Sequence, residues 1–131
     1  LVSRAMRLNQ VTVPALDLAR SIAFYQALGL KLIVKSDHYA RFEVGDGTDT
    51  FSLQLTDDAM GAANGPHVYF ECDDLDARVA GLKAKGVVFD HDPKDQSWLW
   101  REAWLTDPAG VKLCLYHGGE NRRFPPWRLK D

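Results

Sequence analysis

The chain has 131 residues, of which 46% are hydrophobic and 26% charged, and its formal net charge is -2. These values are ordinary for one soluble globular domain, and a chain of this length buries roughly two-thirds of its unfolded surface on folding. The slight negative charge argues against a nucleic-acid partner. No apolar run reaches the roughly 20 residues that a membrane-spanning helix needs, and the N-terminal sequence LVSRAMRLNQ lacks the apolar core of a signal peptide. We therefore expect a cytoplasmic protein without a membrane partner.

The first predicted strand begins at Gln10, where the sequence QVTV alternates polar and aliphatic residues. Asp17 then suits the N-cap of a helix, and Gly29 suits its end, where a left-handed residue is favoured. Three further strands are predicted in this half, at 31–36, 39–44 and 51–56. Together these elements make a first module over residues 8–56.

The segment 57–66 is rich in small and turn-forming residues, and we expect it to be a linker. A second module is predicted over residues 67–117, with Asp74 as the helix N-cap and Gly86 at the helix end. Its later strands are predicted at 87–91, 99–105 and 111–117. The tail 118–131 contains arginines, prolines and aromatic residues, and we expect an extended strap packed on the body or on a partner chain.

An internal repeat relates the two modules. Sliding the chain by 57 residues aligns 10–30 with 67–87 without a gap, and six positions are then identical. The identities include the helix N-cap Asp and the closing Gly of each copy. The repeat predicts one α+β domain, residues 1–131, built from two tandem βαβββ modules.

Strand alternation predicts which side chains oppose the helices. Because the aliphatic residues of each strand must face the helix, the intervening residues face the other way. The predicted far face carries Gln10, Thr12, Ser52, Gln54, Thr56, His67, Tyr69, Glu71, Lys112, Cys114 and Tyr116. Such a polar and aromatic face is typical of a sheet that curls around a ligand. The same alternation places Cys72 and Cys114 on opposite faces, so we expect no disulfide between them.

Aromatic residues suggest the kind of ligand. Tyr69, Tyr116 and Lys112 are predicted to converge, and two aromatic rings with one cation suit an anionic or planar molecule. Trp98, Trp100 and Trp104 share one strand parity and are expected along one face of the penultimate strand. There they form either a wall for a flat ligand or a core or dimer contact.

The motifs LDLARSIAFYQALGL, ECDDLDARVAGLKAKGV and LTDPAGVKLCLYH occur in this order and resemble the vicinal oxygen chelate superfamily, which contains glyoxalases, bleomycin-resistance proteins and dioxygenases. The resemblance covers residues 8–117 and implies eight strands curved around a central cavity, usually in a homodimer. It also implies a position for a divalent metal. In the metal-dependent members the first and last strands of each module supply the ligands, and the matching positions are Gln10, Gln54, His67 and Cys114.

This quartet departs from the pattern of the family. It contains no carboxylate for a hard cation such as Mg²⁺, nor the metal-bound base that glyoxalase chemistry requires. His67 and Cys114 suit a soft metal such as Zn²⁺ or iron, with Gln10 or Gln54 as weak ligands. The alternative, which we favour, is that His67 and Cys114 only line the pocket. A divalent metal is then possible but disfavoured, and the identity of any cofactor is left open. Glu71 is a candidate general base if burial raises its pKa; otherwise it meets solvent or an arginine.

Three functional hypotheses follow. The leading one is a protein that binds a small organic molecule in the central cavity without the standard metal site, as the bleomycin-resistance-like members do. The second is an enzyme: a metal-dependent lyase, isomerase or extradiol-type dioxygenase with altered ligands, or a metal-free one using Glu71. The third is a non-catalytic dimeric interaction module. One scaffold hosts all of these, so fold alone does not decide among them.

Overall fold

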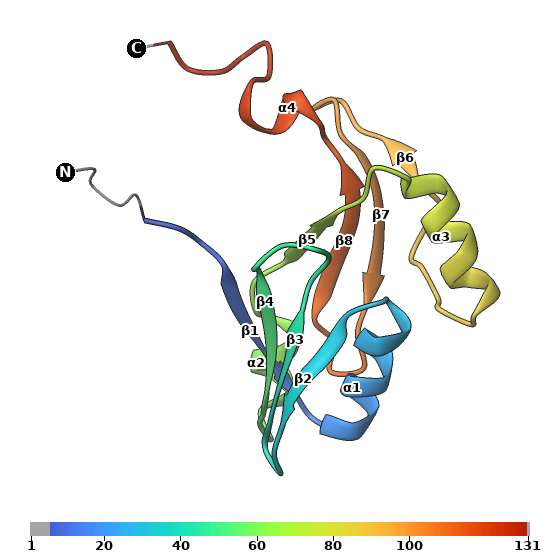
Figure 1. Cartoon of the computed structure of the whole chain (residues 1–131). Coiled ribbons are helices and arrows are strands. Elements are labelled where there is room, and N and C mark those ends of the chain that lie inside the picture. The colour runs from blue at the N-terminus through green and yellow to red at the C-terminus, as the bar shows by residue number, and fades with distance from the viewer. Residues whose placement is uncertain (1–5, 131) are drawn as a thin grey trace.

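The structure is a computed structural model that describes residues 6–130, so the outermost residues of the predicted domain and tail lie outside it. Figure 1 shows the elements in chain order. They are β1 (Gln10–Ala15), α1 (Leu18–Ala27), β2 (Lys31–Lys35), β3 (Tyr39–Glu43), β4 (Thr50–Leu55), α2 (Ala59–Ala63), β5 (Val68–Glu71), α3 (Leu75–Ala84), β6 (Lys94–Asp95), β7 (Arg101–Thr106), β8 (Lys112–His117) and α4 (Glu120–Arg123).

The predicted α+β fold of two tandem βαβββ modules is confirmed. The strands form two four-stranded sheets with the orders β1-β4-β3-β2 and β5-β8-β7-β6, which are the same topology repeated. In each sheet the first strand pairs in parallel with the last strand of its module, and the other pairs are antiparallel. The eight strands are therefore divided between two hydrogen-bonded sheets.

The turn residues behave largely as the repeat predicts. Asp17 caps α1 by accepting a hydrogen bond from the backbone N–H of Arg20, at 3.1 Å. Asp74 makes no side-chain cap on α3 and instead contacts the Nε of Arg78, at 3.3 Å. Gly29 and Gly86 close the two helices with φ values of 103° and 94°, the left-handed region that glycine tolerates best.

The linker 57–66 contains the short helix α2, capped by Asp58. Two local predictions were wrong. The segment 87–91 is not a strand; β6 forms later, at Lys94–Asp95, because Pro93 has no N–H to donate and restricts the residue before it. The next strand begins at Arg101 rather than at residue 99, because Leu99 takes a φ of +70° in a tight turn.

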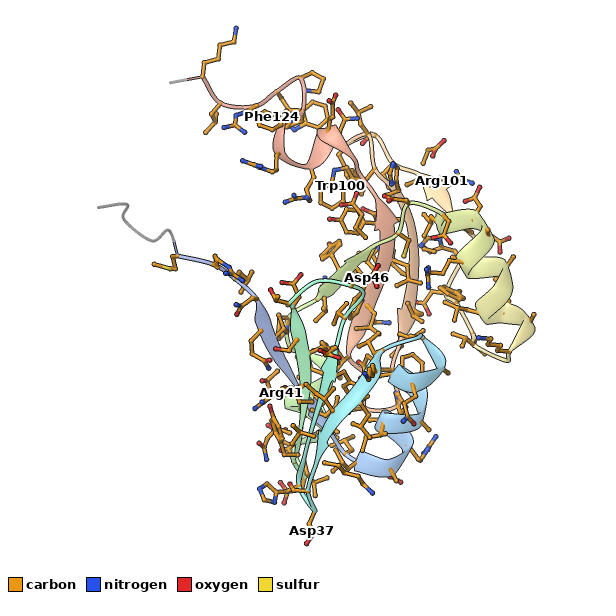
Figure 2. All side chains as sticks on the ribbon, in the orientation of Figure 1. Asp37, Arg41, Asp46, Trp100, Arg101 and Phe124 are labelled. Carbon is orange, nitrogen blue, oxygen red and sulfur yellow. The ribbon has the colours of Figure 1, made fainter. Side chains whose placement is uncertain are left out.

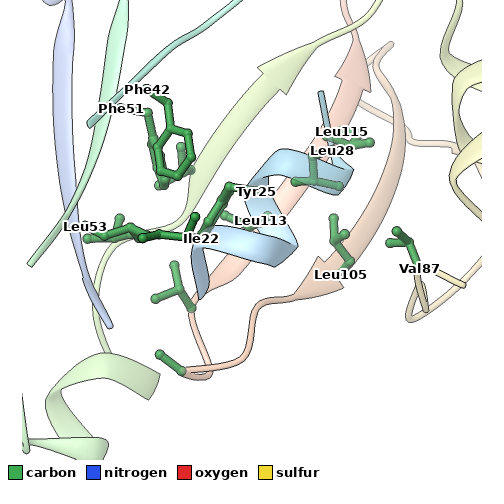
Figure 3. Packing of buried hydrophobic residues seen from close by; sticks show 14 of the residues in the cluster. Ile22, Tyr25, Leu28, Phe42, Phe51, Leu53, Val87, Leu105, Leu113 and Leu115 are labelled. Carbon is green, nitrogen blue, oxygen red and sulfur yellow. The ribbon is translucent and has the colours of Figure 1, made fainter. Parts of the chain in front are cut away.

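One core joins the two modules. Figure 3 shows α1 with Ile22, Tyr25 and Leu28 between the aromatic residues of the first sheet and the leucines of β8. Phe51 of the first sheet also meets Phe70 of the second, with ring centroids 5.7 Å apart. Because the helix-facing sides of both sheets share this core, the opposite sides point outward from it.

The tail follows a different course from a strap on the body. Figure 1 shows the segment after α4 running away from both sheets. Phe124 and Trp127 are 57% and 55% exposed, and the guanidinium groups of Arg123 and Arg128 lie over the ring of Phe124. The start of the tail is held on the body by hydrogen bonds from Gly118 and Gly119 to Glu71, but its end does not form a strap there. Packing of the end on a partner chain stays a prediction. In the part of the chain that the structure covers, no helix has the length and hydropathy to cross a membrane.

Candidate functional site

The outward side of the first sheet carries a hydrogen-bonded network that we call the polar face: Gln10, Thr12, Tyr39, Arg41, Thr50 and Ser52. The Nε2 of Gln10 donates to the hydroxyls of Ser52, at 2.8 Å, and Thr12, at 3.1 Å, and its Oε1 accepts from Thr50. Ser52 Oγ lies 2.6 Å from the hydroxyl of Tyr39, which accepts in turn from Arg41 Nε at 3.0 Å. The network therefore links β1, β4 and β3 into one preorganised surface.

Figure 2 shows Arg41 on the side of this sheet that lies away from α1. Its guanidinium lies over the ring of Tyr39, 5.4 Å from the centroid. Burial alone raises the pKa of Tyr39, but the hydrogen bonds from Ser52 and Arg41 and the charge of Arg41 lower it overall. Tyr39 and Arg41 were missing from the predicted site, although the alternation in YARFE places them opposite the buried Ala40 and Phe42.

The ladder register separates Gln54 from Gln10. Gln10 lies opposite Thr50, whereas Gln54 lies opposite Pro14, four residues further along β4. At about 3.3 Å per residue the two glutamines are about 13 Å apart along the sheet. Gln54 hydrogen-bonds the carbonyl of His38, and with Thr12 it lines a separate hollow of about 350 Å³. The residues of β4 that hydrogen-bond the side chain of Gln10 are Thr50 and Ser52.

The outward side of the second sheet carries a second surface, the aromatic face: His67, Tyr69, Trp98, Trp100, Trp104 and Tyr116. Trp100 and Tyr116 stack with centroids 4.5 Å apart and an interplanar angle of 24°. The ring of Tyr69 stands edge-on to Trp100, Trp104 and Tyr116, at 5.9, 5.5 and 5.7 Å. His67 stands edge-on to Trp104 at 5.3 Å. Such perpendicular contacts are favourable because ring edges are positive and ring faces negative.

The three tryptophans of this face come from two structural elements, the strand β7 and the turn before it. Only Trp104 belongs to the penultimate strand, where it lies opposite Cys114. Trp98 and Trp100 precede β7, in the turn that the left-handed Leu99 closes with a hydrogen bond to Gln96. That turn folds both indoles back over the strand, so the prediction that all three follow one strand was wrong, although they share one surface.

A carboxylate that the sequence analysis did not single out lies beneath these rings. Glu102 is 3% exposed and accepts hydrogen bonds from the indoles of Trp98, at 2.8 Å, and Trp104, at 2.9 Å. It shares the parity of Trp104 and lies opposite Tyr116 on β8. The alternation of REAWLT already places Glu102 on the aromatic side, but its burial follows from the turn that brings Trp98 over it.

Burial and Glu102 set the ionisation of the neighbouring groups. Cys114 is fully buried, and its burial first and then the charge of Glu102 raise the pKa of its thiol to about 12. Burial likewise raises the pKa of Tyr69, with smaller contributions from Cys114 and Glu102. Tyr116 has a raised pKa because of burial and the charge of Glu71. At neutral pH the interior of the aromatic face therefore holds a neutral thiol and neutral phenols.

The four positions of the metal quartet do not fit a metal site. Gln54 is remote from Gln10, and Cys114 is fully buried, so its thiol is not open to a metal on the outer face. The amide of Gln10 is already committed to the hydroxyls around it. Among residues 6–130 no three His, Cys, Asp or Glu side chains lie together as a metal-binding group.

Glu71 and Lys112 are both engaged at the margins of the aromatic face. The carboxylate of Glu71 accepts from the backbone N–H groups of Gly118 and Gly119, at 2.9 Å each. Burial tends to raise its pKa, but these bonds and the charges of His117 and Arg122 lower it overall, the opposite of what a general base needs. Lys112 donates to Thr106 at 2.8 Å and lies 3.8 Å from Asp90.

The two faces adjoin at one hollow. Gln10 of the polar face and Tyr69 of the aromatic face both line a space of about 450 Å³ where β1 and β5 begin, together with Glu71. Tyr69 is 44% exposed, and Gln10, Thr12 and His67 are exposed as well. The side chains that the sequence analysis assigned to a ligand are therefore mostly accessible from outside the single chain, with Cys114 and Tyr116 as buried exceptions.

The fold and its two faces define a class of proteins with paired βαβββ modules. The model of the Glyoxalase/Bleomycin resistance protein/Dioxygenase superfamily matches residues 7–115. The chain therefore belongs to this superfamily, as its motifs indicated.

Solved structures of the same fold have diverse functions. The bleomycin-binding protein of Streptomyces verticillus, in complex with copper(II)-bleomycin, matches with a TM-score of 0.73 and 22% identity, over 88% of this chain and 99% of that one. The bleomycin resistance determinant of transposon Tn5 has the same TM-score and identity, over 87% and 99%. A lactoylglutathione lyase of Agrobacterium tumefaciens matches with a TM-score of 0.71 and 20% identity, over 88% and 96%. No curated protein matches the chain by sequence. These identities establish the fold alone.

Proposed function

We propose that the protein binds a flat organic molecule against its aromatic face, without a metal at the quartet positions. The observation that carries the proposal is the arrangement of Tyr69, Trp100 and Trp104, whose rings meet at steep angles while Tyr69 keeps 44% of its surface exposed. Rings held in fixed orientations lose little conformational entropy when a ligand stacks on them. The solved complexes of bleomycin-binding proteins with bleomycin support small-molecule binding on this scaffold.

We further propose that a homodimer completes the site, with the aromatic face of one protomer opposite the polar face of its partner. Because both faces point outward from the shared core, one chain supplies each half of such a crevice. Exposed apolar side chains adjoin the polar half: Met6 and Leu8 precede β1 and are 99% and 88% exposed. A surface of this kind is typical of a protein–protein contact.

We also propose that the protein is cytoplasmic. Cys72 and Cys114 are both free and buried, which suits a reducing compartment.

An enzymatic role has weaker support. Glu71 holds the C-terminal turn and has a lowered pKa, so it suits a structural role better than proton abstraction. A non-catalytic interaction module is the remaining alternative, and it is favoured if the faces bind a second chain but no small molecule.

Calorimetric titration with two fused-ring probes, quinoline and N-methylquinolinium, tests the proposal. At least one of them should bind saturably, and Tyr69→Ala should weaken that binding roughly tenfold because an aromatic contact is lost. Met60→Ala is the matched control, because Met60 is 77% exposed on α2 and belongs to neither face. Binding that is insensitive to Tyr69→Ala, or no binding, would contradict the proposal. Light scattering should give about twice the chain mass of 14.7 kDa.

A further inference from the structure

Glu102 is buried and takes part in no ion pair in the part of the chain that the structure describes. The residue is 3% exposed, and within residues 6–130 its carboxylate accepts hydrogen bonds only from the neutral indoles of Trp98 and Trp104. None of the ion pairs that these residues form includes Glu102. Lys94 lies opposite Glu102 in the ladder between β6 and β7, but its side chain is exposed and forms no ion pair with the carboxylate. A buried carboxylate without a counter-charge is costly, so folds normally pair it. An unpaired one beneath an open aromatic surface indicates that the missing charge comes from outside.

Two cations at the margins of the aromatic face are paired with other carboxylates. Lys112 lies 3.8 Å from Asp90, at the edge of the face. Arg122 lies 4.0 Å from Glu71, at the start of the tail. Among residues 6–130 the charge of Glu102 is neutralised by no ion pair, and it contributes to the raised pKa values of both Tyr69 and Cys114.

The rings around Glu102 also favour a cation. The faces of indole and phenol rings are negative and attract cations, most strongly where water is excluded. The indoles of Trp98 and Trp104 donate their N–H groups to a carboxylate, which polarises each ring and makes its face more negative. Tyr69, Trp100 and Tyr116 extend this surface with edge-on and stacked contacts.

We propose that the aromatic face selects a flat ligand that carries a positive charge, such as a fused-ring molecule with a quaternary or protonated nitrogen, and that Glu102 supplies the counter-charge. This inference rests on the proposed function and narrows its ligand class. It reverses the expectation of an anionic ligand, which depended on Lys112, because Lys112 is engaged with Thr106 and Asp90. The ligand is still expected to be planar, but its expected charge is now positive instead of negative.

The experiment compares N-methylquinolinium with quinoline at pH 8, where quinoline is neutral and has nearly the same shape. We expect the wild-type protein to bind the cation roughly tenfold or more tightly. Glu102→Gln should bring the two affinities close together, whereas Trp98→Phe, which keeps the carboxylate but removes one N–H donor, should retain most of the preference. Asp92→Asn is the charge-matched control; Asp92 lies away from the aromatic face, paired with Lys83 of α3, and its side chain is 79% exposed.

The outcomes separate the two proposals. Equal affinities in the wild type, with both weakened in Tyr69→Ala, would overturn the charge selection and leave the binding function standing. Failure of both probes to bind would overturn both. If Glu102→Gln does not fold, the ratio of affinities in the wild-type protein still decides whether a cation is preferred.

Discussion

The hydroxyl of Tyr25, on the helix of the first module, donates a 2.6 Å hydrogen bond to Oδ2 of Asp107, in the turn before the last strand of the second module. Both residues are buried, with 0% and 4% of their surfaces exposed. Asp107 Oδ1 accepts in addition from the backbone N–H groups of Ala109 and Val111. Burial and the charge of Asp107 raise the pKa of Tyr25, so the phenol stays a donor at every physiological pH. This bond fastens the two modules together.

Tyr25→Phe should destabilise the protein by about 2 kcal/mol, because the substitution leaves a buried carboxylate oxygen without its donor. The free energy of unfolding in urea measures the effect. The ring contacts of Tyr25 with Phe42 and Phe51 remain in this variant, so packing is preserved. A loss below about 0.5 kcal/mol would mean that the bond does not couple the modules.

Ser21→Ala is the matched test on the same helix. Ser21 is fully buried, and its Oγ has no hydrogen-bond partner among the residues that the structure describes. Removing an unsatisfied buried hydroxyl and gaining a better helix former should leave stability unchanged or raise it by up to about 1 kcal/mol. The same urea titration applies. Marked destabilisation would show that the hydroxyl is satisfied in solution, for example by water.

Glu71 should make the start of the tail sensitive to acid. Its folded-state pKa lies below the unfolded value, so its contribution is fully present above the unfolded pKa and is lost as the pH falls through the folded pKa. Hydrogen exchange of the Gly118 and Gly119 amides should therefore be slow near neutral pH. Their protection, which is the exchange rate of a free amide divided by the observed rate at the same pH, should fall below about pH 4. Glu71→Gln should reduce the protection already at pH 7, and equal protection in both proteins would refute the assignment.

The metal content of the purified protein tests whether Gln10, Gln54, His67 and Cys114 form a metal site. Protein purified without an affinity tag or chelator should contain Zn, Fe, Ni and Mn far below one equivalent, because Cys114 is buried with a thiol pKa of about 12 and Gln54 is remote from Gln10. Elemental analysis provides the measurement. Stoichiometric metal that disappears in both His67→Ala and Cys114→Ala would make a metal-dependent enzyme the leading interpretation.

The sequence predicted the parts of this architecture that depend on local periodicity. The 57-residue repeat identified both βαβββ modules, and strand alternation correctly placed Val13, Leu53 and Leu113 in the core and Gln10 and Tyr69 on the outer faces. These features depend on the pattern within one strand or helix at a time, and a single sequence contains that pattern.

The remaining parts depend on how elements pair in space. Gln10 meets Thr50 and Ser52 rather than Gln54, and this depends on register, because alternation fixes the face of a strand but not its offset against a parallel neighbour. Glu102 was overlooked because its burial depends on a turn with a left-handed leucine, a conformation that leucine rarely adopts. The position of the tail depends on contacts that no local pattern encodes.

The central claim, that the aromatic face is the ligand site, is tested most directly by the indole N–H resonances in a ¹⁵N-correlated NMR titration. The chain has four tryptophans: Trp98, Trp100 and Trp104 belong to the aromatic face, and Trp127 in the tail is an internal control. With whichever of the two fused-ring probes binds more tightly, the resonances of the first three should shift with one common saturation curve while that of Trp127 stays in place. Shifts confined to Trp127, or no shifts at all, would contradict the claim.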